Sequence, residues 1–106
     1  MDQQVKQELN VITDIITKTV PVEQIYLFGS YANGTPHSDS DLDIYVVAKD
    51  SVADCMEASV AIRKAIRDRK TMSVDIVVDK HSTFQRRKTA PTMERMIARE
   101  GVVLYG

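Results

Sequence analysis

The 106-residue sequence contains no tryptophan, one cysteine, three prolines and four glycines, and only 6% of its residues are aromatic. The single cysteine, Cys55, cannot form a disulfide within the chain. The sequence also has no Cys-x-x-Cys pair and no Cys/His cluster, so nothing in it indicates a zinc site. This cysteine usage fits a reducing compartment, and we expect a cytoplasmic protein.

The sequence also lacks a surplus of charge and a long apolar run. Lys and Arg number 14 against 15 Asp and Glu, which gives a net charge of −1. A chain so balanced is not a general binder of polyanions, and we expect no direct contact with nucleic acid. No stretch reaches the roughly 20 apolar residues that a membrane span needs. The N-terminus has no basic, apolar signal-peptide pattern, so we expect no membrane association.

The hydrophobic pattern predicts a single domain over residues 1–106 with an α/β (α+β) fold, a small sheet with helices packed on it. Helical spacing recurs in three segments, and short apolar runs bounded by loops alternate with them. We predict helices over 3–18, 51–69 and 92–100, a helical turn over 30–33, and strands over 25–28, 41–48, 73–78 and 102–105. The link between the first two strands does not fix their relative direction.

Several residues mark the predicted helix ends. Ser51 is the expected N-cap of the long central helix, with Asp54 in its first turn. The segment Ser82-Thr83-Phe84-Gln85 fits a capping box and predicts the start of a further helix. Gly101 is the expected stop of the last helix.

Gly29 follows an apolar strand and precedes the predicted helical turn that begins at Ser30. Helix N-termini present unpaired N–H groups to phosphate, and glycine lets the backbone come close to a ligand. The segment 29–34 imitates half of a P-loop but has Thr35-Pro36 where Lys-Ser/Thr is required. From these residues alone, a structural turn and a phosphate cradle are equally favoured.

Asp41 and Asp43 open the second strand and share one face of it, because alternate residues of a strand point the same way. At about 6.6 Å and an effective dielectric of about 20, their repulsion is roughly 2.5 kcal/mol. A divalent cation turns this repulsion into attraction. The alternative is a pair of solvated carboxylates at a strand entrance. Asp39 continues the alternation, although an Asp in that loop more often forms a turn.

Asp75 lies in an otherwise apolar strand, where burying an unpaired carboxylate is costly. One explanation is a salt bridge to an arginine of the 63–70 region. The other makes Asp75 the third carboxylate of a metal site, on the strand beside Asp41 and Asp43. Magnesium suits that site, because it takes hard oxygen ligands and prefers one or two carboxylates together with substrate phosphates and water.

Gly29-Ser30, the spacing to Asp41-x-Asp43 and the later Asp75 resemble the nucleotidyltransferase superfamily that includes DNA polymerase beta. More closely, the chain is similar to the minimal nucleotidyltransferases, and the resemblance runs over almost the whole sequence. It implies the polymerase beta-like fold, with a small mixed β-sheet.

The resemblance also implies a role for each residue of the motif. Gly29 and Ser30 would bind the terminal phosphates of a nucleoside triphosphate. Asp41 and Asp43 would bind the Mg²⁺ that bridges those phosphates, and Asp75 would share a second Mg²⁺ and take the proton of the attacking hydroxyl. The implied reaction is in-line attack on the α-phosphate with release of pyrophosphate.

Minimal nucleotidyltransferases typically pair with a HEPN-domain toxin. The resemblance therefore implies an antitoxin that transfers AMP from ATP to a tyrosine of that toxin. Two alternatives stay open at this point: a non-catalytic antitoxin that neutralises its partner by covering it, and an enzyme that transfers a nucleotide to a small molecule. Three acidic residues in motif positions count against the first, and the short chain counts against the second.

Overall fold

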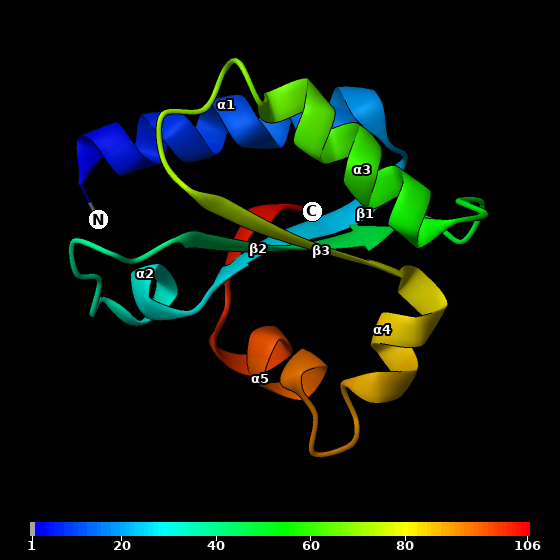
Figure 1. Cartoon of the computed structure of the whole chain (residues 1–106). Helices are drawn as coiled ribbons and strands as arrows, with labels where there is room; N and C mark the ends of the chain where they lie inside the picture. Colours follow the sequence, from blue (N-terminus) through cyan, green and yellow to red (C-terminus); the bar gives the residue numbers. More distant parts are fainter. Residues whose placement is uncertain (1) are drawn as a thin grey trace.

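Four strands form one sheet in the computed structural model, which describes residues 2–106 (Figure 1). They are β1 (Val22–Phe28), β2 (Leu42–Ala48), β3 (Val74–Lys80) and β4 (Val102–Tyr105), in the spatial order β3-β2-β1-β4. β1 is antiparallel to both of its neighbours, whereas β2 and β3 are parallel. The α/β class and the mixed sheet expected from the sequence are therefore confirmed.

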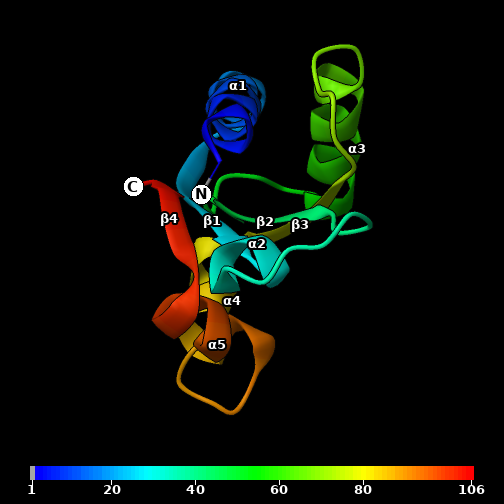
Figure 2. The same cartoon turned by 90° about the vertical axis from the view of Figure 1, so that its left-hand side faces the viewer.

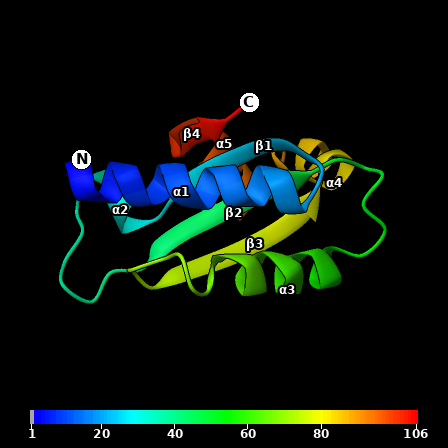
Figure 3. The same cartoon turned by 90° about the horizontal axis from the view of Figure 1, so that it is seen from above.

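Helices cover both faces of this sheet. α1 (Gln3–Thr19) and α3 (Cys55–Ile66) lie on one face, and α4 (His81–Arg87) and α5 (Met93–Glu100) on the other (Figures 1 and 2). Figure 3 shows α1 and α3 running along the sheet on their shared side. The short α2 (Ser30–Asn33) stands at the end where β1 leaves the sheet. None of the helices within residues 2–106 is long and apolar enough to cross a membrane.

Each face of the sheet has its own apolar core. The larger core joins α1 and α3 to the sheet through fully buried side chains such as Ile12, Ile44 and Ile62. The smaller core lies under α4 and α5 and centres on Tyr45 and Phe84, whose rings are 5.5 Å apart. Burying one such side chain stabilises the folded state by about 1.5–3 kcal/mol. The two cores therefore hold the strands, and with them the strand ends, in place.

Buried polar groups join the sheet to α5. The Tyr45 hydroxyl lies 3.0 Å from Asp79 Oδ2 and 3.1 Å from Glu94 Oε2, and its single proton can be donated to only one carboxylate at a time. Arg87 Nε donates to the other oxygen of Glu94 at 3.0 Å. Burial opposes ionisation of Glu94, but these hydrogen bonds and the backbone outweigh it and lower the pKa of Glu94. The network anchors α5 behind the strand that carries Asp43.

The predicted N-cap of α3 and the predicted capping box at Ser82 are wrong, although the helix expected at Ser82 forms as α4. Asp54, not Ser51, is the N-cap of α3, and its carboxylate accepts the backbone N–H of Glu57 at 3.1 Å. A carboxylate that caps a helix satisfies an end N–H and the dipole together, which explains the later start. The capping box at Ser82 does not form, because the Ser82 N–H donates to Asp50, in the connection between β2 and α3, at 2.9 Å.

The outer strand β3 is covered at one point by an arginine. Leu42 donates its N–H to the Ser73 carbonyl, so the peptide groups of every second residue from Ser73 face β2 and those between them face outward. Ile76 is one of the outward residues, and its carbonyl accepts Arg63 Nη2 at 3.1 Å. Arg63 of α3 therefore occupies part of the open edge of the sheet.

Candidate functional site

Gly29 makes the turn from β1 into α2 and packs directly on Asp43. Its backbone has φ 76° and ψ −157°, a conformation that side chains with a Cβ rarely adopt. A Cβ at this position would collide with the Asp43 carboxylate. The predicted glycine turn is therefore found, and only glycine fits it because backbone and carboxylate come so close.

Ser30 begins α2 and is held by a residue that the sequence analysis did not single out. Its Oγ lies 3.0 Å from the Oγ of Ser40, and Ser40 Oγ also accepts the backbone N–H of His37 at 2.9 Å. Ser40 thus ties the loop before β2 to the start of α2. In the sequence Ser40 stands directly before Asp41, in a serine-rich loop, and that position gives no direction for its side chain.

The carboxylates of Asp43 and Asp75 belong to neighbouring parallel strands and are partners in register. Parallel register partners lie about 4.8 Å apart across the sheet, and their side chains leave the same face. Asp43 is also the register partner of Phe28, the last residue of β1. Asp41 lies just before β2, where its side chain is exposed. One end of the sheet, on the face that α4 and α5 cover, therefore holds Phe28, Asp41, Asp43 and Asp75.

The fold raises the pKa of Asp43. Partial burial is the largest cause, and the negative charges of Asp75 and then Asp41 add to it. The negative charges of Asp75 and Asp41 therefore both act on the Asp43 carboxylate in the folded chain. Two like charges this close favour a bound cation or a shared proton.

Asp75 differs from the expectation in its burial. The apolar residues around it predict a buried strand, but β3 is an outer strand and the Asp75 side chain is exposed. The alternative salt bridge to an arginine of the 63–70 region is also wrong. The ion pairs within residues 2–106 are Lys18–Asp14 and Arg87–Glu94, and Arg63 is bonded to a backbone carbonyl instead.

The donor set suits a hard cation in its chemistry, although the side chains do not form a ready-made cage. Among residues 2–106, no three Asp, Glu, His or Cys side chains are gathered closely enough to hold a metal ion by themselves. Mg²⁺ usually takes one or two carboxylates and completes its shell with substrate phosphates and water. The pair Asp43 and Asp75, with Asp41 beside it, fits that requirement.

A family model described as "Polymerase beta, Nucleotidyltransferase" matches residues 10–106 of the chain. The Shewanella oneidensis protein named Protein adenylyltransferase MntA is 46% identical to the chain over 44 residues. That match covers 41% of this chain and 32% of MntA, so it spans about a third of the curated relative's length.

Two of the similar solved structures match nearly all of the chain. A toxin–antitoxin structure with AMP-PNP has 27% identity and a TM-score of 0.59, and the match covers 92% of this chain and 73% of that one. A tri-AMPylated Shewanella oneidensis HEPN toxin in complex with an MNT antitoxin has 24% identity and a TM-score of 0.50, with 95% and 71% covered. At that identity the second likeness shows the fold alone.

Proposed function

The chain belongs to the polymerase beta nucleotidyltransferase family, and on that basis we propose that it is a Mg²⁺-dependent enzyme that transfers AMP from ATP to a protein hydroxyl. The acceptor would be a tyrosine of a cognate HEPN toxin, and the transfer would make the chain an antitoxin. One observation carries the proposal: Asp43 is the register partner of Asp75 and packs on the Gly29 turn. Phosphate and cation would therefore be bound side by side.

In this proposal the Gly29–Ser30 turn binds the terminal phosphates. The backbone at Gly29 has room for a phosphate oxygen because no Cβ stands there, and the Ser30 hydroxyl is already oriented by Ser40. Asp41 and Asp43 would hold Mg²⁺ against those phosphates, and Asp75 would share a second ion. Bound Mg²⁺ stabilises the charge that develops on the attacking and leaving oxygens.

Asp75 is suited to act as the base. Its exposed carboxylate lies on the outer strand, where a hydroxyl of a second protein has access to it. As the acceptor oxygen forms its bond to the α-phosphorus, the bond to the β-phosphate breaks and pyrophosphate leaves. The hydroxyl proton passes to the Asp75 carboxylate.

The partner is supported by the comparisons. The relative that shares 46% identity over 44 residues is named a protein adenylyltransferase, and the structure with 27% identity is a toxin–antitoxin pair with an ATP analogue. A phosphate ester on a toxin tyrosine would add negative charge. The family resemblance implies that this tyrosine lies near a ribonuclease site of the toxin, where the added charge would repel the RNA backbone and inactivate the toxin.

We also propose that residues 1–106 act as one nucleotidyltransferase domain in the cytoplasm. Both apolar cores are built on the same four-stranded sheet, so neither is complete without the strands they share. Cys55 is a free thiol, as expected in a reducing compartment.

The test is to incubate the purified chain with α-labelled ATP, Mg²⁺ and the cognate HEPN toxin. We expect label on the toxin, and Asp43→Asn should lower the rate at least about 100-fold because it removes a cation ligand. Asp68→Asn, an equally conservative change at an exposed position after α3, is the matched control and should keep full activity.

Other outcomes separate the alternatives. A toxin that is inhibited but carries no label would overturn enzymatic transfer in favour of a binding antitoxin. Label found only on a small molecule would overturn the protein acceptor. Full activity of Asp43→Asn at saturating Mg²⁺ would overturn the assigned metal site.

A further inference from the structure

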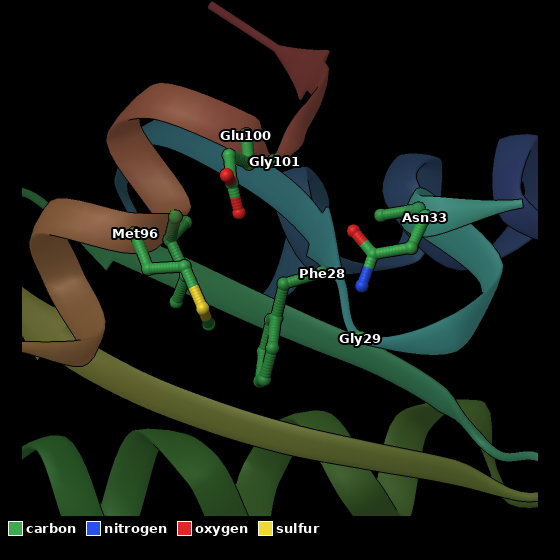
Figure 4. Close-up of a pocket in the computed structure, with 8 residues that line it drawn as sticks. Phe28, Gly29, Asn33, Met96, Glu100 and Gly101 are labelled. Atoms are coloured by element: carbon green, nitrogen blue, oxygen red, sulfur yellow. The ribbon is translucent and has the colours of Figure 1, made fainter.

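A slot opens between α2 and α5, next to the Gly29 turn (Figure 4). It encloses about 260 Å³ of space, including the solvent at its mouth. Apolar walls come from Phe28 at the end of β1 and from Met96 of α5, and polar groups come from Asn33 and Glu100. Figure 4 shows the Glu100 carboxylate and the Asn33 amide directed toward the opening, with the Phe28 and Met96 side chains beside it. None of them belongs to the Asp41, Asp43 and Asp75 set.

The slot is continuous with the candidate active site. Gly29 belongs to both, because it lines the slot and packs against the Asp43 carboxylate. Phe28 is the register partner of Asp43, so its ring leaves the sheet beside that carboxylate. A molecule whose phosphates lie on the Gly29–Ser30 turn therefore has the slot within reach of its other end.

The polar groups in the slot are free to bind a ligand. Within residues 2–106, neither the Glu100 carboxylate nor the Asn33 side-chain amide takes part in a side-chain hydrogen bond or ion pair. Glu100 is also the last residue of α5, where a negative charge is unfavourable next to the negative end of the helix dipole. Helix stability therefore gives no reason for a carboxylate at this position.

We propose that the slot binds the base of the nucleotide, and that Glu100 selects bases with an exocyclic amino group. This inference rests on the proposed function, because it takes a nucleoside triphosphate to be bound at Gly29–Ser30. Phe28 and Met96 offer apolar surfaces to the faces of a flat ring. A carboxylate only accepts hydrogen bonds, so Glu100 attracts an amino group and repels a carbonyl, while the Asn33 amide can donate to a ring nitrogen.

The experiment compares ATP with purine riboside triphosphate, which is ATP without its 6-amino group. Binding of each nucleotide is measured by calorimetry with Mg²⁺ and without an acceptor, so that the readout does not depend on transfer. We expect ATP to bind about tenfold more tightly to the unchanged chain, the value of one hydrogen bond to a charged group. UTP, which presents a carbonyl at the corresponding place, should bind more weakly than ATP.

Two substitutions at Glu100 make the test specific. Glu100→Ala removes the acceptor, and the ratio of the two affinities should fall to near one. Glu100→Gln keeps one acceptor oxygen and should retain part of the preference. Glu57→Ala, at an exposed position of α3 on the other face of the sheet, is the matched control and should keep the full ratio. Because Glu100 is exposed, neither of its variants should lower the melting temperature.

The possible results separate this inference from the proposed function. Equal affinity of the unchanged chain for ATP and purine riboside triphosphate would overturn the base slot and leave the transferase intact. A preference that persists in Glu100→Ala would also overturn the role of Glu100. If the chain shows the expected preference but never labels a toxin, the base slot is supported and the proposed transfer is overturned. If the chain binds no nucleotide at all, both proposals are overturned.

Discussion

Asp43 is the residue whose acid–base behaviour the fold changes most clearly at the site. Its pKa is raised by partial burial and by the charges of Asp75 and Asp41. A carboxyl whose pKa is higher in the folded than in the unfolded chain destabilises the fold when it ionises. That penalty is present above the raised pKa and disappears as the pH falls below the ordinary value of 3.8.

We therefore predict that Asp43→Asn is more stable than the unchanged chain at pH 7 in EDTA, and that the difference shrinks as the pH is lowered toward about 4. Thermal unfolding of both proteins across this range measures the effect. A stability difference that stays constant with pH would contradict the electrostatic cause. Asp68→Asn, at an exposed position after α3, is the control and should show no such pH-dependent difference.

Gly29 and Gly34 flank the same short helix and allow a paired substitution. Gly29→Ala should cost about 1–3 kcal/mol, because the backbone is strained for alanine and the Cβ collides with Asp43. Gly34→Ala should cost about 1–2 kcal/mol, since Gly34 is left-handed but has open space around it. Urea unfolding gives both values, and only Gly29→Ala should also weaken nucleotide binding. Equal binding by both variants would contradict the phosphate role of Gly29.

The motif residues were predictable because each is marked by a local pattern. Gly29, Asp41 and Asp43 stand at fixed distances from a strand, and Asp75 interrupts an apolar run. Ser40 and Glu100 were missed, because their partners are remote in sequence. Ser40 acts on Ser30 across a loop, and Glu100 reaches the site only through the packing of α5 on the sheet. No local spacing encodes such contacts.

At the scale of elements, the positions of helices and strands followed from periodicity, but several ends did not. β1 begins at Val22 and β3 continues to Lys80, both beyond the predicted apolar runs. Pairing in the sheet extends them, because Val22 faces Ala48 and Lys80 faces that same residue from the other side. The end of a strand depends on the end of the strand it pairs with, and that partner is remote in the sequence.

The polar network around Tyr45 supplies a test at this scale, since it joins β2, β3 and α5. Tyr45→Phe should destabilise the fold by about 1–3 kcal/mol, because Asp79 and Glu94 lose a buried donor. Tyr105→Phe, at an exposed position of β4, is the control and should change stability by less than about 0.5 kcal/mol. Denaturant unfolding followed by circular dichroism measures both. A loss no larger than that of the control would show that the network is stabilised without the hydroxyl.

At the scale of the whole molecule, binding of the nucleotide should raise the free energy of unfolding. MgATP at about 100 times its dissociation constant adds roughly 2.7 kcal/mol to the folded state. For a domain of this size we expect the melting temperature to rise by roughly 10 °C. ATP with EDTA should give a much smaller rise, and so should MgATP with Asp43→Asn. An equal rise with and without Mg²⁺ would contradict the cation site.

The arrangement of the sheet was the largest feature that the sequence left undetermined. A helix between β2 and β3 allowed their parallel pairing, but nothing local showed that β1 runs antiparallel to β2 or that β4 pairs with β1. Those pairings are contacts between segments that lie far apart in the sequence. The order β3-β2-β1-β4 nevertheless decides the site, because it makes the strand of Asp75 an outer one.

The same strand order leaves the outward peptide groups of β3 without a neighbouring strand. Arg63 covers one of these groups, the Ile76 carbonyl. Exposed edge strands of this kind can pair with strands of other molecules and start fibrils. Before a strand of another molecule can pair with β3 at this point, the Arg63 guanidinium must leave the Ile76 carbonyl, or its charge must be buried in the new contact. The Arg63 contact therefore discourages polymerisation along β3.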